Sequence, residues 1–182
     1  MISTTGRLLV ASPLMGDPHF ERSVILMIQH NEDGAFGVVL NNQSDTSVEK
    51  MLPSWSKLAS APASLFLGGP VAPESLIGLA RVVEKTNKRF QPLVENVGPI
   101  DLDQEQGELY QNVKAIRLFA GYSGWGPKQL ETELTLGAWF VLDADPGDAF
   151  ITEPDQLWSF VLRRQHGPIA WLANYPTNPK LN

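Results

Sequence analysis

A glycine-rich stretch at residues 121–131 constrains the fold more than any other part of the chain. Its sequence is Gly121-Tyr122-Ser123-Gly124-Trp125-Gly126-Pro127-Lys128-Gln129-Leu130-Glu131. Glycines this close together are typical of backbone that turns sharply or packs closely against another segment. The preceding residues 114–120 alternate polar and apolar side chains, which predicts a strand. Pro127 suits the first turn of a helix, and Gly137 would end it. We therefore expect a strand, a tight turn and a short helix.

Length and composition predict one globular domain over residues 1–182, with loose termini at residues 1–6 and 176–182. The 182 residues are enough for a substantial core, and 43% apolar and 19% charged residues are ordinary for a globular protein. No apolar run approaches the roughly 20 residues needed to span a bilayer. The first residues show no signal-peptide pattern. We expect a cytoplasmic protein that makes no membrane contact.

Cysteine usage and charge narrow the possible functions. The sequence has no cysteine, which excludes disulfides, thiolate zinc sites and cysteine nucleophiles. Its net charge is −6, and its densest basic groups are Lys85–Arg89 and the pair Arg163-Arg164. Binding to a phosphate backbone needs clustered cations. Direct contact with nucleic acid is therefore not expected.

Strand patterns outnumber helical patterns in the rest of the chain. Short strand-like runs cover residues 7–11, 24–28, 35–41, 65–67, 77–83 and 138–142. Helices are expected near residues 46–53 and from about Pro154 onwards, where Thr152-x-x-Asp155 has capping-box spacing. Hairpin signals are more frequent than strand–helix–strand signals, which favours a single α+β domain with a mostly antiparallel sheet.

The clearest hairpin joins the second and third expected strands. Residues 31–34, Asn-Glu-Asp-Gly, are turn-forming, and we expect a somewhat longer loop around them. Gly37 falls inside the third strand, which predicts a bulge or a close backbone approach there.

Two catalytic motifs are near misses in the central stretch. Gly121-x-Ser123-x-Trp125 lacks the last glycine of a nucleophile elbow. Gly121-x-x-x-x-Gly126-Pro127-Lys128 displaces the lysine of a P-loop and places Gln129 at the magnesium-binding position. The start of the helix still offers backbone donors to an anion. The alternative, which we favour, is a tight turn packed by Trp125.

No metal or cofactor is predicted. Asp143, Asp145 and Asp148 lack the later glutamate and the spacing of a calcium loop, and aspartates beside Pro-Gly ordinarily cap turns. The three histidines, His19, His30 and His166, have no ligand-like spacing.

The loop Asp17–Ser23 places an acid, an imidazole, a guanidinium and a hydroxyl at the edge of a buried strand. Arg22 could hold a carboxylate or phosphate with two parallel hydrogen bonds. The interpretation we favour is an internal ion pair of Arg22 with Asp17 or Glu21. The five tryptophans are expected to be core or interface anchors.

Several short pieces form a pattern along the chain. The first are Leu9-Val10-Ala11-Ser12-Pro13, Asp17-Pro18-x-Phe20-x-Arg22-Ser23-Val24 and His30-Asn31-x-x-Gly34-Ala35-x-Gly37-Val38-x-x-Asn41. The later ones are Gly68-Gly69-Pro70-Val71, Gly121-Tyr122-x-Gly124-Trp125-Gly126-x-x-Gln129-Leu130-Glu131 and Ala138-Trp139. In these pieces, which run from about Leu8 to the final helix, the chain resembles the YqgE/AlgH family of bacterial proteins.

This resemblance implies a bent sheet folded into a partial barrel with flanking helices. The family has no established activity and no assigned catalytic residues, and one member is linked to transcriptional regulation of exopolysaccharide synthesis. Relatives often carry alanine at the position of Ser123, which argues against Ser123 as a nucleophile.

Three functional hypotheses follow. The first is a non-enzymatic binding or regulatory protein whose partner is an unidentified small molecule or protein. Its site would lie where residues 121–131 meet residues 17–23 and 68–71, in the connecting segments that commonly carry function. The residues expected to bind are Arg22, Gly68, Gly69, Tyr122, Trp125 and Gln129. The second is an enzyme of unrecognised type that uses Arg22, His30 or Tyr122 in a shared pocket, and the third is a transcription-associated regulator, direct or indirect.

Overall fold

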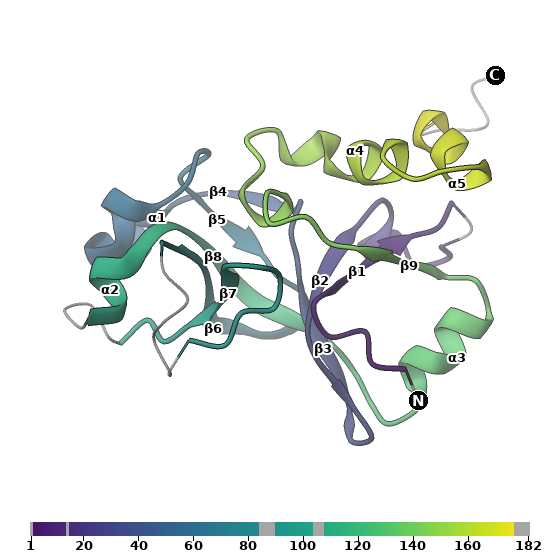
Figure 1. Cartoon of the computed structure of the whole chain (residues 1–182), viewed down its shortest axis with the longest axis horizontal. Coiled ribbons are helices and arrows are strands. Elements are labelled where there is room, and N and C mark those ends of the chain that lie inside the picture. Colours follow the sequence, from purple (N-terminus) through teal and green to yellow (C-terminus); the bar gives the residue numbers. More distant parts are fainter. Residues whose placement is uncertain (1, 14, 84–89, 104–107, 177–182) are drawn as a thin grey trace.

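The computed structural model describes residues 2–13, 15–83, 90–103 and 108–176 (Figure 1). Its strands are β1 (Arg7–Ala11), β2 (Val24–Asn31), β3 (Gly34–Val39), β4 (Gln43–Ser47), β5 (Ser64–Leu67), β6 (Val71–Val82), β7 (Val97–Ile100), β8 (Val113–Trp125) and β9 (Trp139–Asp143). Its α-helices are α1 (Val48–Met51), α2 (Glu108–Asn112), α3 (Gln129–Thr135), α4 (Leu157–Arg163) and α5 (Pro168–Trp171). Short 3-10 helices cover Pro18–Phe20, Pro53–Leu58, Asp148–Phe150, Pro154–Gln156 and Leu172–Asn174.

The strands of this described part form one bent sheet that stays open. Its main order is β4-β5-β8-β3-β2-β1-β9, and β6 pairs with both β7 and β8. All pairs are antiparallel except β5 with β8. The long strand β8 pairs with β5 and β6 in one half of the sheet and with β3 in the other half (Figure 1). The predicted α+β class with a mostly antiparallel bent sheet is confirmed.

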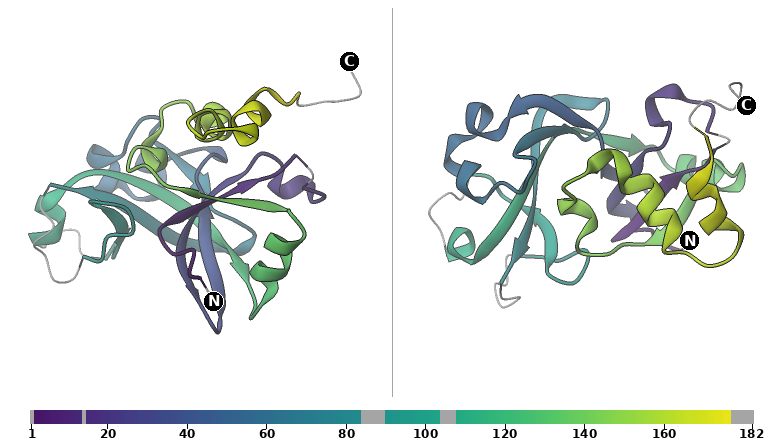
Figure 2. Two further views of the ribbon diagram at one scale, coloured as in Figure 1. Left: turned by 45° about the vertical axis from the view of Figure 1, so that its right-hand side comes forward. Right: turned by 90° about the horizontal axis from the view of Figure 1, so that it is seen from above.

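The half of the sheet that contains β1, β2, β3 and β9 is covered on both faces. Leu8 and Val10 of β1 belong to the core cluster that also contains Leu157 and Trp158 of α4. The alternate residue Leu9 joins a separate cluster with Leu130 of α3. Figure 2 shows the C-terminal helices against one face of the sheet. Strand alternation therefore assigns α4 and α3 to opposite faces.

The hairpin of β2 and β3 is tighter than the sequence predicted. Asn31 pairs with Gly34, so only Glu32 and Asp33 connect the strands. The predicted irregularity at Gly37 is confirmed, because the register shifts between Met27 and Gln29. A Cβ atom on Gly37 would lie 2.4 Å from the carbonyl oxygen of Leu26.

The glycine-rich stretch is part of a strand rather than a turn, which corrects the prediction. Residues 121–125 are the last residues of β8. Gly121 has φ of +65°, a backbone conformation that L residues rarely adopt. A Cβ atom there would lie 2.6 Å from the carbonyl oxygen of Gly69 and 2.8 Å from that of Val71. The glycine bends β8 where the backbone of the 68–71 segment packs directly against it.

The turn expected within that stretch lies later, at residues 126–128. Lys128, with φ of +63°, is the N-cap of α3, so Pro127 precedes the helix instead of occupying its first turn. The helix ends as predicted, since Gly137 follows it with φ of +76° and donates its N–H to the carbonyl of Leu134.

The two ends of the chain differ from the predictions. Residues 3–5 were expected to be loose, but Thr4 is buried and hydrogen-bonded to His30.

The Thr152–Asp155 capping box is absent, because Glu153 precedes the 3-10 helix Pro154–Gln156 without a side-chain cap bond. Residues 177–182 of the expected loose tail, and the whole basic group Lys85–Arg89, lie outside the described residues. Within the described residues, no helix has the length and apolar character needed to cross a bilayer.

We predict that Gly121→Ala destabilises the protein by at least about 2 kcal/mol, because a Cβ atom at positive φ costs about 1–2 kcal/mol and here also meets backbone. Gly126→Ala is the matched control, since its nearest neighbour would be the Gln129 Oε1 atom at 3.9 Å. Urea unfolding measures both. Equal stability of the two variants would contradict the assigned bend.

Candidate ligand-binding groove

The Glu133 carboxylate organises the end of β8, the start of α3 and β9. Its Oε2 atom accepts hydrogen bonds from the indole Nε1 atoms of Trp125 and Trp139, each at 2.8 Å. Its Oε1 atom accepts one from Gln129 Nε2 at 3.0 Å. The two indole rings meet edge to face, with centroids 6.0 Å apart. A single carboxylate therefore holds two tryptophans from different strands.

Trp125 and Gln129, both predicted to bind a ligand, are thus engaged in internal hydrogen bonds. Gln129 also accepts the backbone N–H of Gly126 on its Oε1 atom at 3.0 Å, which closes the turn before α3. Sequence reasoning missed Glu133. The available signal was its position four residues after Gln129, which places both side chains on one face of the helix.

Gly68 and Gly69 allow close backbone packing against β8. The N–H of Gly68 donates to the carbonyl of Ala120 at 2.8 Å, and Ser123 Oγ donates to the carbonyl of Gly68 at 3.2 Å. A Cβ atom on Gly69 would lie 2.3 Å from the carbonyl of Tyr122. Ser123 is 1% exposed, which argues against a role as nucleophile.

Arg22 holds the C-terminal segment rather than an acidic neighbour. Its guanidinium lies 4.6 Å from the centre of the Trp158 ring, and its Nη2 atom donates to the carbonyl of Tyr175. The predicted internal ion pair of Arg22 is wrong, since Arg22 is in none of the salt bridges of the described residues. Asp17 instead caps the adjacent turn by accepting the N–H of His19 at 2.9 Å.

His30 joins the N-terminal segment to α3. Its Nδ1 atom accepts the backbone N–H of Thr4 at 3.2 Å, so the ring proton of neutral His30 is assigned to Nε2. The Nε2 atom lies 3.3 Å from Glu131 Oε1. His30 is buried on the α3 side of β2, and these contacts of its ring are internal.

Three arginines hold the segment between β9 and α4. Arg164 binds both carboxylate oxygens of Asp148 at 2.6 and 2.7 Å, and this hydrogen bonding raises its pKa. Arg81 Nη2 donates to the carbonyl of Pro146 at 2.7 Å. Arg117 is 1% exposed, and its Nη2 atom donates to the carbonyl of Ile151 at 3.2 Å. Burial lowers the pKa of Arg117 to about 10, so Arg117 stays charged at neutral pH.

The predicted aspartate cluster is part of the same turn. Asp148 accepts the N–H of Asp145, and Asp145 accepts the N–H of Gly147, each at 2.8 Å. These carboxylates cap a turn and pair with Arg164, which agrees with the interpretation that we favoured over metal binding.

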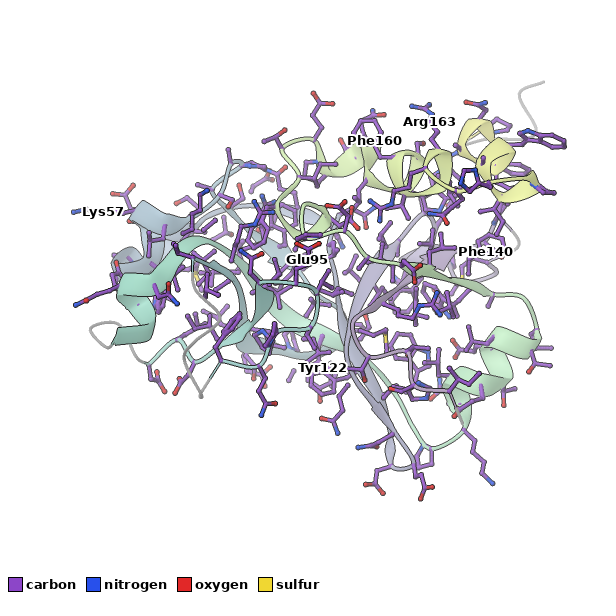
Figure 3. All side chains as sticks on the ribbon, viewed as in Figure 1. Lys57, Glu95, Tyr122, Phe140, Phe160 and Arg163 are labelled. Carbon is purple, nitrogen blue, oxygen red and sulfur yellow. The ribbon has the colours of Figure 1, made fainter. Side chains whose placement is uncertain are left out.

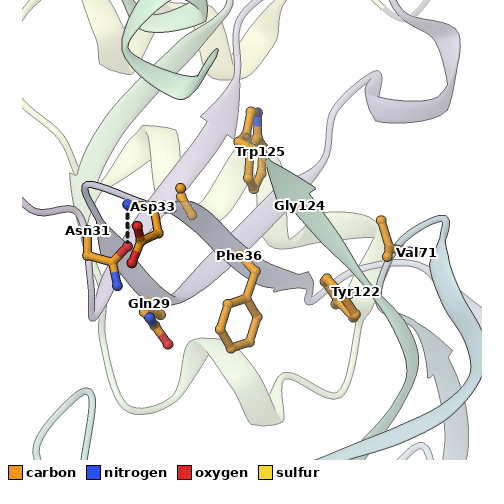
Figure 4. A pocket seen from close by; sticks show the side chains of 10 residues that line it. Gln29, Asn31, Asp33, Phe36, Val71, Tyr122, Gly124 and Trp125 are labelled. Carbon is orange, nitrogen blue, oxygen red and sulfur yellow. Dashed lines mark hydrogen bonds between the residues drawn. The ribbon is translucent and has the colours of Figure 1, made fainter. Parts of the chain in front are cut away.

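An open groove of about 380 Å³ lies beside Tyr122, and we call it the Tyr122 groove. It is lined by Gln29, Asn31, Asp33, Gly34, Ala35, Phe36, Val71, Tyr122, Gly124 and Trp125. The strand register produces it, because Gln29 pairs with Phe36 and Phe36 pairs with Gly124. Figure 4 shows Phe36 between Gln29 and Tyr122, while Trp125 points to the other side of the ribbon.

The described lining of the Tyr122 groove is aromatic, rich in hydrogen-bond acceptors and without basic side chains. The rings of Phe36 and Tyr122 meet edge to face with centroids 5.6 Å apart. Within the described part of the chain, the Gln29 amide and the Tyr122 hydroxyl form no hydrogen bond. Asp33 is the charged side chain of the lining. The groove can therefore stack a ligand and accept hydrogen bonds from it.

A second cavity, of about 310 Å³, lies on the other side of the Gly69-Pro70 turn. It is lined by Asp17, His19, Phe20, Val39, Asn42, Leu67, Gly69 and Pro70. The three predicted loops are thus neighbours, but they do not form one cavity. Tyr122 and Trp125 line the first groove, Gly69 lines the second cavity, and Arg22 lines a third of about 130 Å³ beside Trp158. Among the described residues, Tyr122 lines the first of these three cavities and Arg22 the third, and His30 is in none of the three.

The fold and this groove define a class of protein: an α+β protein with one open sheet, whose glycine-rich central strand borders a shallow aromatic groove. Residues 8–170 match the sequence model of the AlgH-like family, and the chain belongs to this family. A UPF0301 protein of Streptomyces coelicolor is 46% identical over 99% of this chain and 96% of its own length. A UPF0301 protein of Thermobifida fusca is 40% identical over 100% of this chain and 96% of its own length.

Solved structures agree with the fold. The crystal structure of a protein from Corynebacterium diphtheriae matches with a TM-score of 0.84 and 34% identity, over 93% of this chain and 91% of that one. The solution structure of the AlgH protein from Pseudomonas aeruginosa matches with a TM-score of 0.68 and 25% identity, over 97% and 96% of the two chains. The resemblance drawn from the sequence motifs is confirmed.

We predict that Glu133→Ala destabilises the protein by at least about 2 kcal/mol, since each hydrogen bond to a charged group contributes about 1.5–3 kcal/mol. The indole N–H resonances of Trp125 and Trp139 should shift together in the NMR spectrum. Glu32→Ala, which removes an exposed carboxylate from the hairpin turn, is the control. A stable Glu133→Ala variant with unshifted indole signals would refute the proposed role of Glu133.

We predict that Arg22→Met weakens the attachment of the C-terminal segment and costs about 1–2 kcal/mol. Chymotrypsin should then cut faster after Trp171, whereas the bond after Tyr175 precedes Pro176 and resists this protease. Arg163→Met, at an exposed arginine of α4, should leave the cleavage rate unchanged. Unchanged cleavage in Arg22→Met, combined with loss of a ligand that the wild type binds, would support the binding role predicted from the sequence instead.

Proposed function

We propose that this chain is a cytoplasmic, non-enzymatic binding protein that takes a small molecule in the Tyr122 groove and acts as a regulator through that ligand. The observation that carries the proposal is the placement of Gln29 and Tyr122, two polar side chains without a hydrogen bond in the described part of the chain, on either side of Phe36 (Figure 4). Polar groups placed beside aromatic side chains in a concave surface are the usual components of a ligand site.

Binding is favoured over catalysis because the reactive side chains lie apart. The hydroxyl of Ser123 is buried against Gly68, and the imidazole of His30 faces α3 on the other side of β2. A nucleophile needs a base within hydrogen-bonding reach. Neither side chain lines the Tyr122 groove.

We propose that any regulation of transcription by this protein is indirect. The relative from Pseudomonas aeruginosa is the AlgH protein, and the family resemblance links one member to such regulation. In the described residues, Arg22, Arg81, Arg117 and Arg164 donate to carbonyls of their own chain, and Arg7 pairs with Asp143 at 2.9 Å. These arginines are therefore engaged, and a protein partner that senses the liganded groove is the favoured route over direct contact with DNA.

Thermal unfolding against cationic, neutral and anionic metabolites tests the proposal. A ligand present at a hundred times its Kd stabilises by about 2.7 kcal/mol, which raises Tm by about 5–10 °C for a chain of this size. Gln29→Ala and Tyr122→Phe should each reduce that shift. Asn42→Ala, in the second cavity, should preserve it.

Two results would contradict the proposal. One is a panel in which compounds of all three charge classes leave Tm unchanged. The other is a Tm shift that survives both groove variants and disappears in Asn42→Ala, which would move the site to the second cavity.

A further inference from the structure

We infer that the Tyr122 groove selects an organic cation, either an alkylammonium or a guanidinium group. This inference rests on the proposed function and specifies the ligand class of the same groove. Three features of the lining carry it: its charge, its aromatic corner and its free acceptors.

The charge of the groove disfavours anions and favours cations. The described residues of its lining include no lysine, arginine or histidine, and Asp33 supplies a carboxylate. Asn31 Oδ1 accepts the backbone N–H of Asp33 at 2.9 Å and so fixes the turn that carries this carboxylate. The whole chain has a net charge of −6, and its field attracts cations toward the surface.

The aromatic rings provide faces for the cation. Phe36 and Tyr122 stand at 68° to each other, with centroids 5.6 Å apart, and form two walls of a corner. The negative face of each ring attracts a cation placed over it. Gly124 leaves space in this corner, since a Cβ atom there would contact the Tyr122 ring at 3.4 Å. Two aromatic rings and one carboxylate therefore line the same groove.

The free acceptors match the N–H groups of a cation. The Gln29 side-chain oxygen and the Tyr122 hydroxyl, unpaired in the described residues, flank Phe36. A guanidinium has five N–H donors and no acceptor. A ligand with such a head would replace water at the exposed Gln29 amide and at the Tyr122 hydroxyl.

Two pairs of probes with matched shape test the inference by NMR titration of the folded wild-type protein. Choline, which has no N–H group and so tests charge and ring faces alone, is compared with 3,3-dimethyl-1-butanol. Butylguanidinium, which also has N–H donors, is compared with butylurea, and each pair differs chiefly in charge. The cations should shift the backbone amides of Phe36, Tyr122 and Gly124 in a saturable way. The neutral partners should bind at least about tenfold more weakly, a difference of about 1.4 kcal/mol.

Two variants and two controls show whether the cation binds in the Tyr122 groove. Asp33→Asn removes the charge and Phe36→Leu removes the ring face, and each should weaken cation binding about tenfold. Asp45→Asn changes an exposed carboxylate on β4. Phe160→Leu changes a half-exposed ring on α4, on the opposite side of the molecule from Tyr122 (Figure 3). Both controls should bind the cations as the wild type does.

The outcomes separate this inference from the proposed function. Equal binding of a cation and its neutral partner overturns the selection of cations but leaves a ligand site in the groove. If the chemical-shift changes saturate with neither cation up to about 10 mM, the inference is overturned. A cation that binds equally well to Asp33→Asn and Phe36→Leu overturns it as well.

A further comparison identifies the source of the cation. A capped tripeptide with a central arginine presents the same guanidinium on a peptide backbone. Binding about tenfold tighter than that of butylguanidinium indicates an arginine side chain of a partner protein, since the flanking peptide then adds contacts. Equal or weaker binding indicates a free small cation, and both results support recognition of the charged head.

Discussion

The close approach of residues 68–69 to β8 is the constraint on which the rest of the structure depends. β8 serves both halves of the sheet, and it bends at Gly121, where Gly69 and Val71 occupy the space that a Cβ atom would need. Overlap of that size is not tolerated by packed backbone. The glycines thus allow one strand to connect the β5–β6–β7 half with the β1–β2–β3–β9 half. This bend also brings Tyr122 beside Val71 and so creates one wall of the groove.

The end of β8 has two faces with different roles. On the α3 side, Glu133 binds the indoles of Trp125 and Trp139, which fixes helix and strands with hydrogen bonds to a charged group. On the opposite side, Phe36 and Tyr122 are half-buried and border an open groove. A rigid inner face supports an outer face whose geometry is set by strand register, an arrangement that suits binding because preorganised groups lose little entropy.

The sequence predicted the features that depend on local patterns and missed those that depend on contacts distant in the chain. Short apolar runs predicted β1, β2 and β9, and Gly37 predicted the bulge or close approach, because both signals are local. The stretch 121–125 was assigned to a turn, since glycines serve turns and bent strands alike and only φ distinguishes them. Arg22 was paired with its neighbours, whereas its partner Tyr175 lies 153 positions away. The groove was only partly predictable, because the pairing of β2, β3 and β8 brings Gln29 and Phe36 beside Tyr122 and Gly124.

The measurement that tests the central claim most directly is a crystal structure after soaking with a mixture of small cationic, neutral and anionic fragments. The account predicts bound fragments in the Tyr122 groove, in contact with Phe36 and Gln29, while the Glu133 hydrogen bonds to both indoles stay intact. Fragments that bind only in the cavity beside Phe20, or that displace Gln129 and open the Glu133 cluster, would contradict the division of β8 into a structural face and a binding face.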